Sequence, residues 1–208
     1  MQIIRTFLRA KHWQIFVIAF GIPVVFQTAI MGFMFGSMTN SPEPNPLVML
    51  DFMKFYPLIT LLYLGAIFGW FWSVSIGLQP QLPEGAKMKT KQFKFFFFIP
   101  LIYIIAILIG MIFAANYLTI DPAEPEFGLI FAGFAIIFPL HFFSMFCIFY
   151  LMYFAAKTIK TVEMGRMATF SDFGGDFFLI WFFFIGIWFI QPRVNKLATK
   201  EVQPNRFP

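Results

Sequence analysis

Four long runs of apolar residues, almost free of charge, constrain this chain more than any other feature. They cover approximately residues 15–36, 55–77, 95–118 and 127–154. A helix needs about 20 apolar residues to cross the hydrocarbon core of a bilayer, and each run is at least that long. The chain is 60% hydrophobic with a mean hydropathy of +0.78, which leaves too little polar surface for a soluble fold. The sequence therefore predicts an all-α integral membrane protein, with four transmembrane helices in a single membrane domain.

A fifth apolar segment, at about residues 173–190, is the ambiguous part of this plan. Its continuous apolar stretch, Phe177–Ile190, rises only about 21 Å as a helix, against a hydrocarbon core of about 30 Å. We expect Pro192 to end this helix, so that residues 191–208 form a basic cytoplasmic tail. Two interpretations remain: a short re-entrant or half-spanning helix, and a fifth crossing of the membrane.

Fourteen of the fifteen Lys and Arg residues lie in four segments that this topology places on one side. The N-terminus holds three, the loop 77–94 four, the loop 155–172 three and the tail four. Because Lys and Arg concentrate on the cytoplasmic side, both termini are expected to be cytoplasmic, in a bacterial inner (plasma) membrane. The charge pattern favours a re-entrant fifth segment, whereas hydropathy favours a crossing. A re-entrant backbone must be buried in protein, so the main helices are expected to surround it.

Two further patterns concern packing. Apolar residues interleave with Arg5 and Arg9 at the N-terminus, which favours a short helix lying on the lipid headgroups. Small residues recur at four-residue spacing in every main run, beginning at Gly32, Gly65 and Gly110 in the first three. Such pairs let helix backbones approach closely. We favour packing within the chain, with oligomerisation as the alternative.

His141 is the strongest candidate for chemistry inside the membrane. It lies near the middle of the fourth run, where ionisable side chains are rare and often mark a pathway or site. Gln27 of the first run is expected at a similar depth, within reach of a hydrogen bond. The pair is either a functional polar site or a neutral histidine that holds helices together.

Charged residues flank the fifth segment on both sides. Asp172 and Asp176 are one helical turn apart, and they form either a carboxylate pair at the mouth of the segment or a helix cap with a first-turn acid. Arg193 and Lys196 follow the segment. They either bind lipid phosphate or act only as topology determinants.

No motif for metal, nucleotide or nucleophilic chemistry occurs: HExxH, CxxC, GxSxG and the phosphate loop are absent. We therefore expect no catalytic residue, metal or cofactor. The net charge of +5 follows from topology, so no nucleic-acid partner is expected. The expected function is a non-catalytic accessory or scaffold subunit of a membrane complex, or a homo-oligomer. Its expected partners are anionic lipid headgroups at the basic face and other membrane subunits or its own copies.

Two alternatives to this function remain. The first alternative is a small transporter, channel or lipid-binding protein, with a site near His141 and the fifth segment. A membrane enzyme acting on lipid comes third, and it would depend on Asp172 and Asp176 as its acid-base pair.

Overall fold

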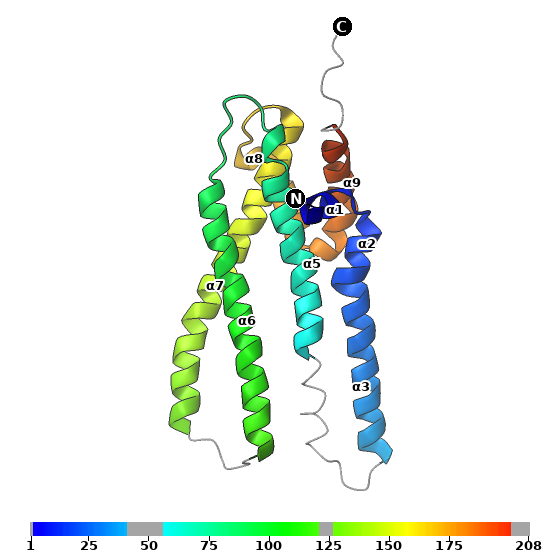
Figure 1. Cartoon of the computed structure of the whole chain (residues 1–208), viewed down its shortest axis with the longest axis vertical. Coiled ribbons are helices and arrows are strands. Elements are labelled where there is room, and N and C mark those ends of the chain that lie inside the picture. The colour runs from blue at the N-terminus through cyan, green and yellow to red at the C-terminus, as the bar shows by residue number, and fades with distance from the viewer. Residues whose placement is uncertain (1, 41–55, 121–126, 201–208) are drawn as a thin grey trace.

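The computed structural model describes residues 2–40, 56–120 and 127–200, and every regular element within these ranges is helical. Figure 1 shows most of the helices running along the long axis of the molecule. In chain order they are α1 (Gln2–Arg9), α2 (His12–Phe16), the π-helical turn η1 (Val17–Gly21), α3 (Ile22–Asn40), α5 (Tyr56–Gly77), the 3₁₀ turn η2 (Gln79–Gln81), α6 (Thr90–Ile120), α7 (Phe127–Met164), α8 (Phe170–Trp181) and α9 (Phe183–Lys200).

Four helical stretches in the described residues are long and apolar enough to cross a membrane. They are His12–Ser37, Tyr56–Gln81, Thr90–Phe113 and Gly133–Met164. The number and order of membrane-length helices predicted from the apolar runs are thereby confirmed. Two helices extend further than predicted: α6 begins at Thr90 rather than 95, and α7 continues to Met164 rather than 154. Hydropathy marks only the apolar part of a helix, whereas backbone hydrogen bonds continue into polar residues.

The first membrane-length stretch contains a π-helical turn just before Pro23. The backbone N–H of Ile22 bonds to the carbonyl of Val17, five residues earlier, and α3 then continues through the proline. Proline has no N–H and its ring crowds the preceding turn, and a wider turn at this point accommodates both effects.

Helix α1 lies across the bundle and packs on α5 (Figure 1). A Cβ atom added to Gly69 of α5 would lie 2.6 Å from the ring of Phe7, and one added to Gly77 would lie 2.5 Å from Ile4. A larger residue at either position would require side chains of α1 to shift. The predicted N-terminal helix is confirmed, and the contact that positions it is with α5.

The predicted close packing at the other small residues is absent within the described part of the chain. A Cβ atom added at Gly32, Gly65 or Gly110 would meet no neighbouring atom within 4 Å. Packing inside the chain is therefore seen at Gly69, the second residue of the pair that begins at Gly65, and not at Gly32, Gly65 or Gly110 among the described residues. Residue spacing reports which residues share a helix face, but it does not report whether another helix covers that face.

The fifth apolar segment is a helical hairpin, not a single helix. The chain breaks at Phe182, whose ψ of 55° leaves the helical range, and α9 returns toward the end where α8 began (Figure 1). Gly186 sits directly against α8, because a Cβ atom there would lie 1.7 Å from the carbonyl oxygen of Leu179. The two predicted boundaries were wrong, since α8 begins at Phe170 rather than 173 and α9 runs through Pro192 to Lys200.

Pro192 does not end α9, although proline interrupts one helical hydrogen bond. Buried apolar residues recur along α9 on both sides of it at helical spacing: Ile187, Ile190, Val194 and Leu197. Burial of this stripe compensates for the missing hydrogen bond. Residues 191–200 are therefore part of the packed structure, and the predicted tail from 191 to 208 was wrong over this part.

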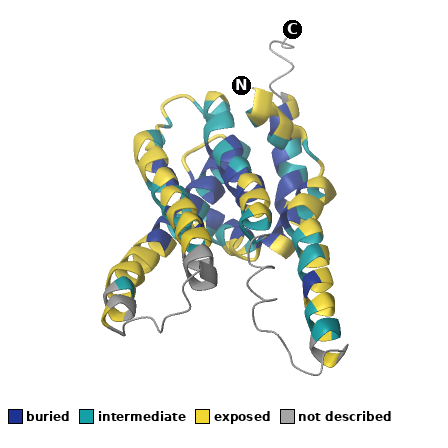
Figure 2. Cartoon of the chain, turned by 60° about the horizontal axis from the view of Figure 1, so that its bottom comes forward, coloured by how far each residue is buried: buried dark blue, intermediate teal, exposed yellow. Residues whose placement is uncertain are grey.

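The buried core is concentrated at the end that holds α1, α8 and α9 (Figure 2). Helix α5 passes through this core, and half of its most apolar window is buried. The corresponding windows of the other three membrane-length stretches are only 17% buried. Toward the opposite end, the helices α3, α6 and α7 therefore expose broad apolar surfaces.

Candidate functional site

A buried glutamine joins three elements at the core end of the molecule. The Oε1 atom of Gln191 accepts a hydrogen bond from the indole Nε1 of Trp70, at 2.7 Å. Its Nε2 atom donates to the backbone carbonyls of Phe7 and Ala10, at 2.9 and 2.8 Å. Gln191 is completely buried, and these bonds use both ends of its amide. It therefore ties α9 to α5 and to the end of α1.

Asn195, one turn further along α9, makes the same kind of contact. Its Nδ2 atom donates to the carbonyls of Leu8 and Ala10, at 2.7 and 3.0 Å. The last carbonyls of a helix have no partner within the helix, so α9 caps the C-terminus of α1 with two amide side chains. This arrangement is structural, and it explains why α1 is held across the bundle.

Arg193 forms the centre of a second polar cluster. Its Nε and Nη2 atoms bond to both carboxylate oxygens of Glu163 on α7, at 2.6 and 2.5 Å. Its Nη1 and Nη2 atoms bond to both oxygens of Asp176 on α8, at 2.6 and 2.8 Å. Bonds to Asp176 and then to Glu163 raise the pKa of Arg193 above its ordinary value. Two bidentate carboxylate pairs thus join α7, α8 and α9.

Asp172 does not share a site with Asp176. Both oxygens of Asp172 bond to Arg166, at 2.9 and 3.1 Å, and one also accepts the backbone N–H of Thr169, at 2.8 Å. The hydrogen bonds from Arg166, followed by those from Thr169, hold the pKa of Asp172 well below its usual range. Asp172 is thus a first-turn acid at the start of α8, but the cap is Thr169, and Asp176 lies beyond the first turn in an ion pair with Arg193.

The residues predicted to bind lipid phosphate are in different environments. Four N–H···O bonds to carboxylates already occupy the guanidinium of Arg193, so little of it is available to an anion. Lys196 is exposed on α9. The two side chains therefore do not form a joint phosphate site in this arrangement.

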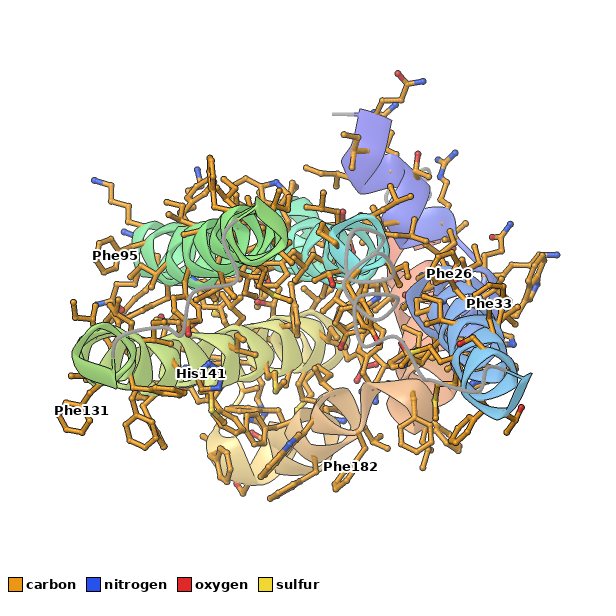
Figure 3. The ribbon with its side chains drawn as sticks, turned by 90° about the horizontal axis from the view of Figure 1, so that it is seen from below. Phe26, Phe33, Phe95, Phe131, His141 and Phe182 are labelled. Atoms are coloured by element: carbon orange, nitrogen blue, oxygen red, sulfur yellow. The ribbon has the colours of Figure 1, made fainter. Side chains whose placement is uncertain are left out.

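The predicted intramembrane pair is also separated. The Nδ1 atom of His141 lies 3.3 Å from the hydroxyl of Tyr103 on α6. The Nε2 atom of Gln27 donates to the hydroxyl of Tyr56 on α5, at 3.1 Å. Figure 3 shows His141 on α7, away from α3, the helix of Gln27. His141 is exposed on the surface of the chain, and its polar contact is with a neighbouring helix.

Two cavities occur at the end that carries the interhelical loops. The larger, about 630 Å³, is open and lies beside the turn that follows α5; its lining includes Gln79, Pro83 and Lys94. The smaller, about 260 Å³, lies between the start of α6 and the last part of α7. Neither cavity is lined by His141, Asp172 or Asp176. Among the described residues, no group of three or more His, Cys, Asp or Glu side chains is placed to hold a metal ion.

Sequence reasoning missed Gln191 and Glu163. Gln191 directly follows an apolar run, and its helical neighbours Ile187, Ile190 and Val194 are all buried. A helical continuation through Pro192 would have placed Gln191 beside this buried stripe. Glu163 carried no comparable signal, because its partner is 30 residues away in the sequence.

The described residues thus form an all-helical structure with four helices of membrane length. At one end of it, buried polar and charged side chains join the helices to one another. Comparison with protein-family models, curated proteins and solved structures found no match to this chain.

Proposed function

We propose that this chain is a non-catalytic, multi-pass protein of the inner (plasma) membrane. It would act as an accessory or scaffold subunit of a membrane complex, or as a homo-oligomer. The observation that carries this proposal is the low burial of three of the four membrane-length stretches, each 17% buried in its most apolar window. Apolar surface of this extent is stable in lipid or against other transmembrane helices, and not in water.

The polar contacts support a structural role over a catalytic one. Gln191 and Arg193 have their hydrogen-bonding groups directed at other helices. Asp172, the remaining acid-base candidate, is paired with Arg166. A general acid or base needs a titratable group that can reach a substrate, and these groups are engaged within the protein.

In the proposed topology, α8 and α9 form a re-entrant hairpin and both termini are cytoplasmic. The 12 residues of α8 rise about 18 Å, which is short of the roughly 30 Å hydrocarbon core. The start of α8 and the end of α9 lie at the same end of the molecule, together with the loop before α6 (Figure 1). That end carries most of the Lys and Arg residues, which supports a cytoplasmic assignment.

Cysteine labelling tests this topology. In a Cys147→Ser background, which removes the only native cysteine, a single cysteine is placed after Lys200. A membrane-impermeant maleimide should label it only after the membrane is opened. Labelling from the outside of intact cells would rule out the re-entrant topology.

The functional proposal is tested by purification from the native membrane in a mild detergent. The mass of the purified particle is then measured by light scattering, and the proteins that co-purify are identified by mass spectrometry. A stoichiometric complex with larger membrane proteins, or a homo-oligomer, is the expected result. A monodisperse single chain, recovered alone from several detergents, would contradict the proposal.

One observation favours the lipid-binding alternative over a transport pathway. His141 lines neither cavity, whereas three lysines line the smaller one. Neither of these two cavities supports a passage along His141, and the basic cavity is a candidate for an anionic ligand.

A further inference from the structure

The smaller cavity lies at the loop end of the α6–α7 pair and is lined by several cationic side chains, of which Lys87 and Lys89 are exposed and Lys157 is half-buried. It is formed by the segment that leads into α6 and by one face of α7, and its volume is about 260 Å³. We call it the lysine cavity. Its lining residues are Lys87, Met88, Lys89, Gln92, Tyr150, Tyr153, Phe154 and Lys157. Three of these eight side chains are cationic, and none is acidic.

The described carboxylates near this end do not neutralise the lysine cavity. Glu163 and Asp176 are both paired with Arg193, and Asp172 is paired with Arg166. Glu84, three residues before Lys87, is exposed and forms no ion pair with a described residue. No lysine of the cavity lies within ion-pair distance of a carboxylate of any described residue. The cavity therefore holds a concentrated positive charge that an anion would complement.

Aromatic side chains line one wall and the floor of the lysine cavity. The hydroxyl of Tyr150 donates to Oε1 of Gln92, at 3.4 Å, and the ammonium of Lys157 lies 5.8 Å from the centre of the Tyr153 ring. This cation–π interaction holds the side chain of the half-buried Lys157 along the wall of the cavity. Phe154, which is 2% exposed, forms the buried floor.

The size of the cavity limits what it can hold. Pockets for drug-sized ligands usually have volumes of about 300–1,000 Å³, so 260 Å³ suits a smaller group. A phosphate with a short polar substituent fits this range, whereas acyl chains would have to lie outside the cavity. The outer faces of α6 and α7 are apolar enough for that, with Phe95 and Phe146 among their exposed side chains.

We infer that the lysine cavity binds the phosphate group of an anionic ligand, carried either by a lipid headgroup or by a soluble phosphate ester. Lysine ammonium groups are donors suited to phosphate oxygens. The lipid source rests on the proposed membrane location, whereas phosphate binding itself does not. The inference also moves the expected phosphate site from Arg193 and Lys196 to the cavity between the start of α6 and the last part of α7.

The test measures ligand binding to the purified full-length chain in a neutral detergent. Dioleoyl phosphatidylglycerol, dioleoyl phosphatidylcholine and glycerol 3-phosphate are titrated separately, and bound ligand is counted by native mass spectrometry. The cavity variant is Lys89→Gln with Lys157→Gln. The matched control is Lys91→Gln with Lys196→Gln, which removes the same charge from exposed positions outside the cavity.

We expect phosphatidylglycerol to bind the wild type at least tenfold more tightly than phosphatidylcholine. The cavity variant should lose roughly thirtyfold in affinity, since a basic residue near a membrane contributes about fivefold. The control should stay within about threefold of the wild type, because its lysines lie outside the cavity. Competition by glycerol 3-phosphate would assign the site to a soluble ester, and its failure to compete would assign it to a lipid.

A charge-preserving variant separates binding from folding. Lys89→Arg with Lys157→Arg should keep most of the affinity for phosphatidylglycerol, because both cations remain. Equal losses in the cavity and control variants would overturn the inference, as would equal binding of the two lipids by the wild type together with no binding of glycerol 3-phosphate. These outcomes are independent of whether the chain belongs to a larger complex, because the binding is measured on the isolated protein.

Discussion

The substitution Gly186→Ala tests the hairpin on which the packed end of the molecule depends. An added Cβ atom would lie 1.7 Å from the carbonyl oxygen of Leu179 and 2.5 Å from its carbon. Carbon–oxygen contacts of this kind are normally about 3.3–3.6 Å, so α8 and α9 would have to separate by more than about 1.5 Å. The obstacle is backbone rather than a side chain, and it cannot move away by changing rotamer.

The magnitude follows from two opposing effects. Overpacking in a close-packed region costs about 1–3 kcal/mol, and a backbone clash belongs at the upper end of that range. Alanine is favoured over glycine inside a helix by about 1 kcal/mol, which offsets part of the loss. We therefore expect Gly186→Ala to lower the free energy of unfolding by about 2 kcal/mol, equivalent to a decrease of roughly 4–8 °C in Tm.

The chain offers both a control and a probe for this measurement. At Gly175 of α8, an added Cβ atom would meet no neighbouring atom within 4 Å, so Gly175→Ala should leave Tm unchanged or raise it. Cys147 is the only cysteine and is completely buried. Its reaction with a thiol-specific fluorescent dye during heating therefore reports unfolding in detergent. If Gly186→Ala melts at the same temperature as Gly175→Ala, the close approach of α8 and α9 is refuted.

Three further predictions use the same melting assay. Gln191→Leu removes three hydrogen bonds and leaves the indole N–H of Trp70 without that acceptor, so it should destabilise the protein by about 3 kcal/mol; an unchanged Tm would contradict the buried amide contacts. Arg193→Gln leaves two partly buried carboxylates without their cation and should cost about 2 kcal/mol, less than for a fully buried pair; a stabilised variant would count against the ion-pair cluster. His141→Ala loses one contact with Tyr103 at an exposed position and should change stability by less than about 1 kcal/mol. A loss of activity or of complex formation without a loss of Tm would identify His141 as functional.

The candidate residues show where sequence reasoning about this chain stops. Depth along a helix can be read from residue number, and it suggested that His141 and Gln27 lie at similar levels. The direction in which each side chain points depends on how the helices are rotated and packed, and each residue bonds to a different tyrosine instead. The same limit applies to Asp176, whose partner Arg193 lies beyond the turn of the hairpin.

At the N-terminus, the sequence predicts the helix but not the helix against which it packs. The alternation of apolar and basic residues was sufficient to predict a helix there, and α1 is observed. What it packs against was not predictable from that alternation, because the glycines that receive it, Gly69 and Gly77, belong to a different helix. Their positions reflect a contact between distant segments and not a local preference.

The sequence alone determined the number and order of the membrane-length helices and the concentration of positive charge at one end. These properties depend on each segment separately, through the free energy of placing its side chains in an apolar environment. Only the tertiary structure decided the break at Phe182, the continuation of α9 through Pro192 and the attachment of α1 by Gln191 and Asn195. Those features depend on contacts between segments up to 187 residues apart in the sequence, whose free energy no single segment contains.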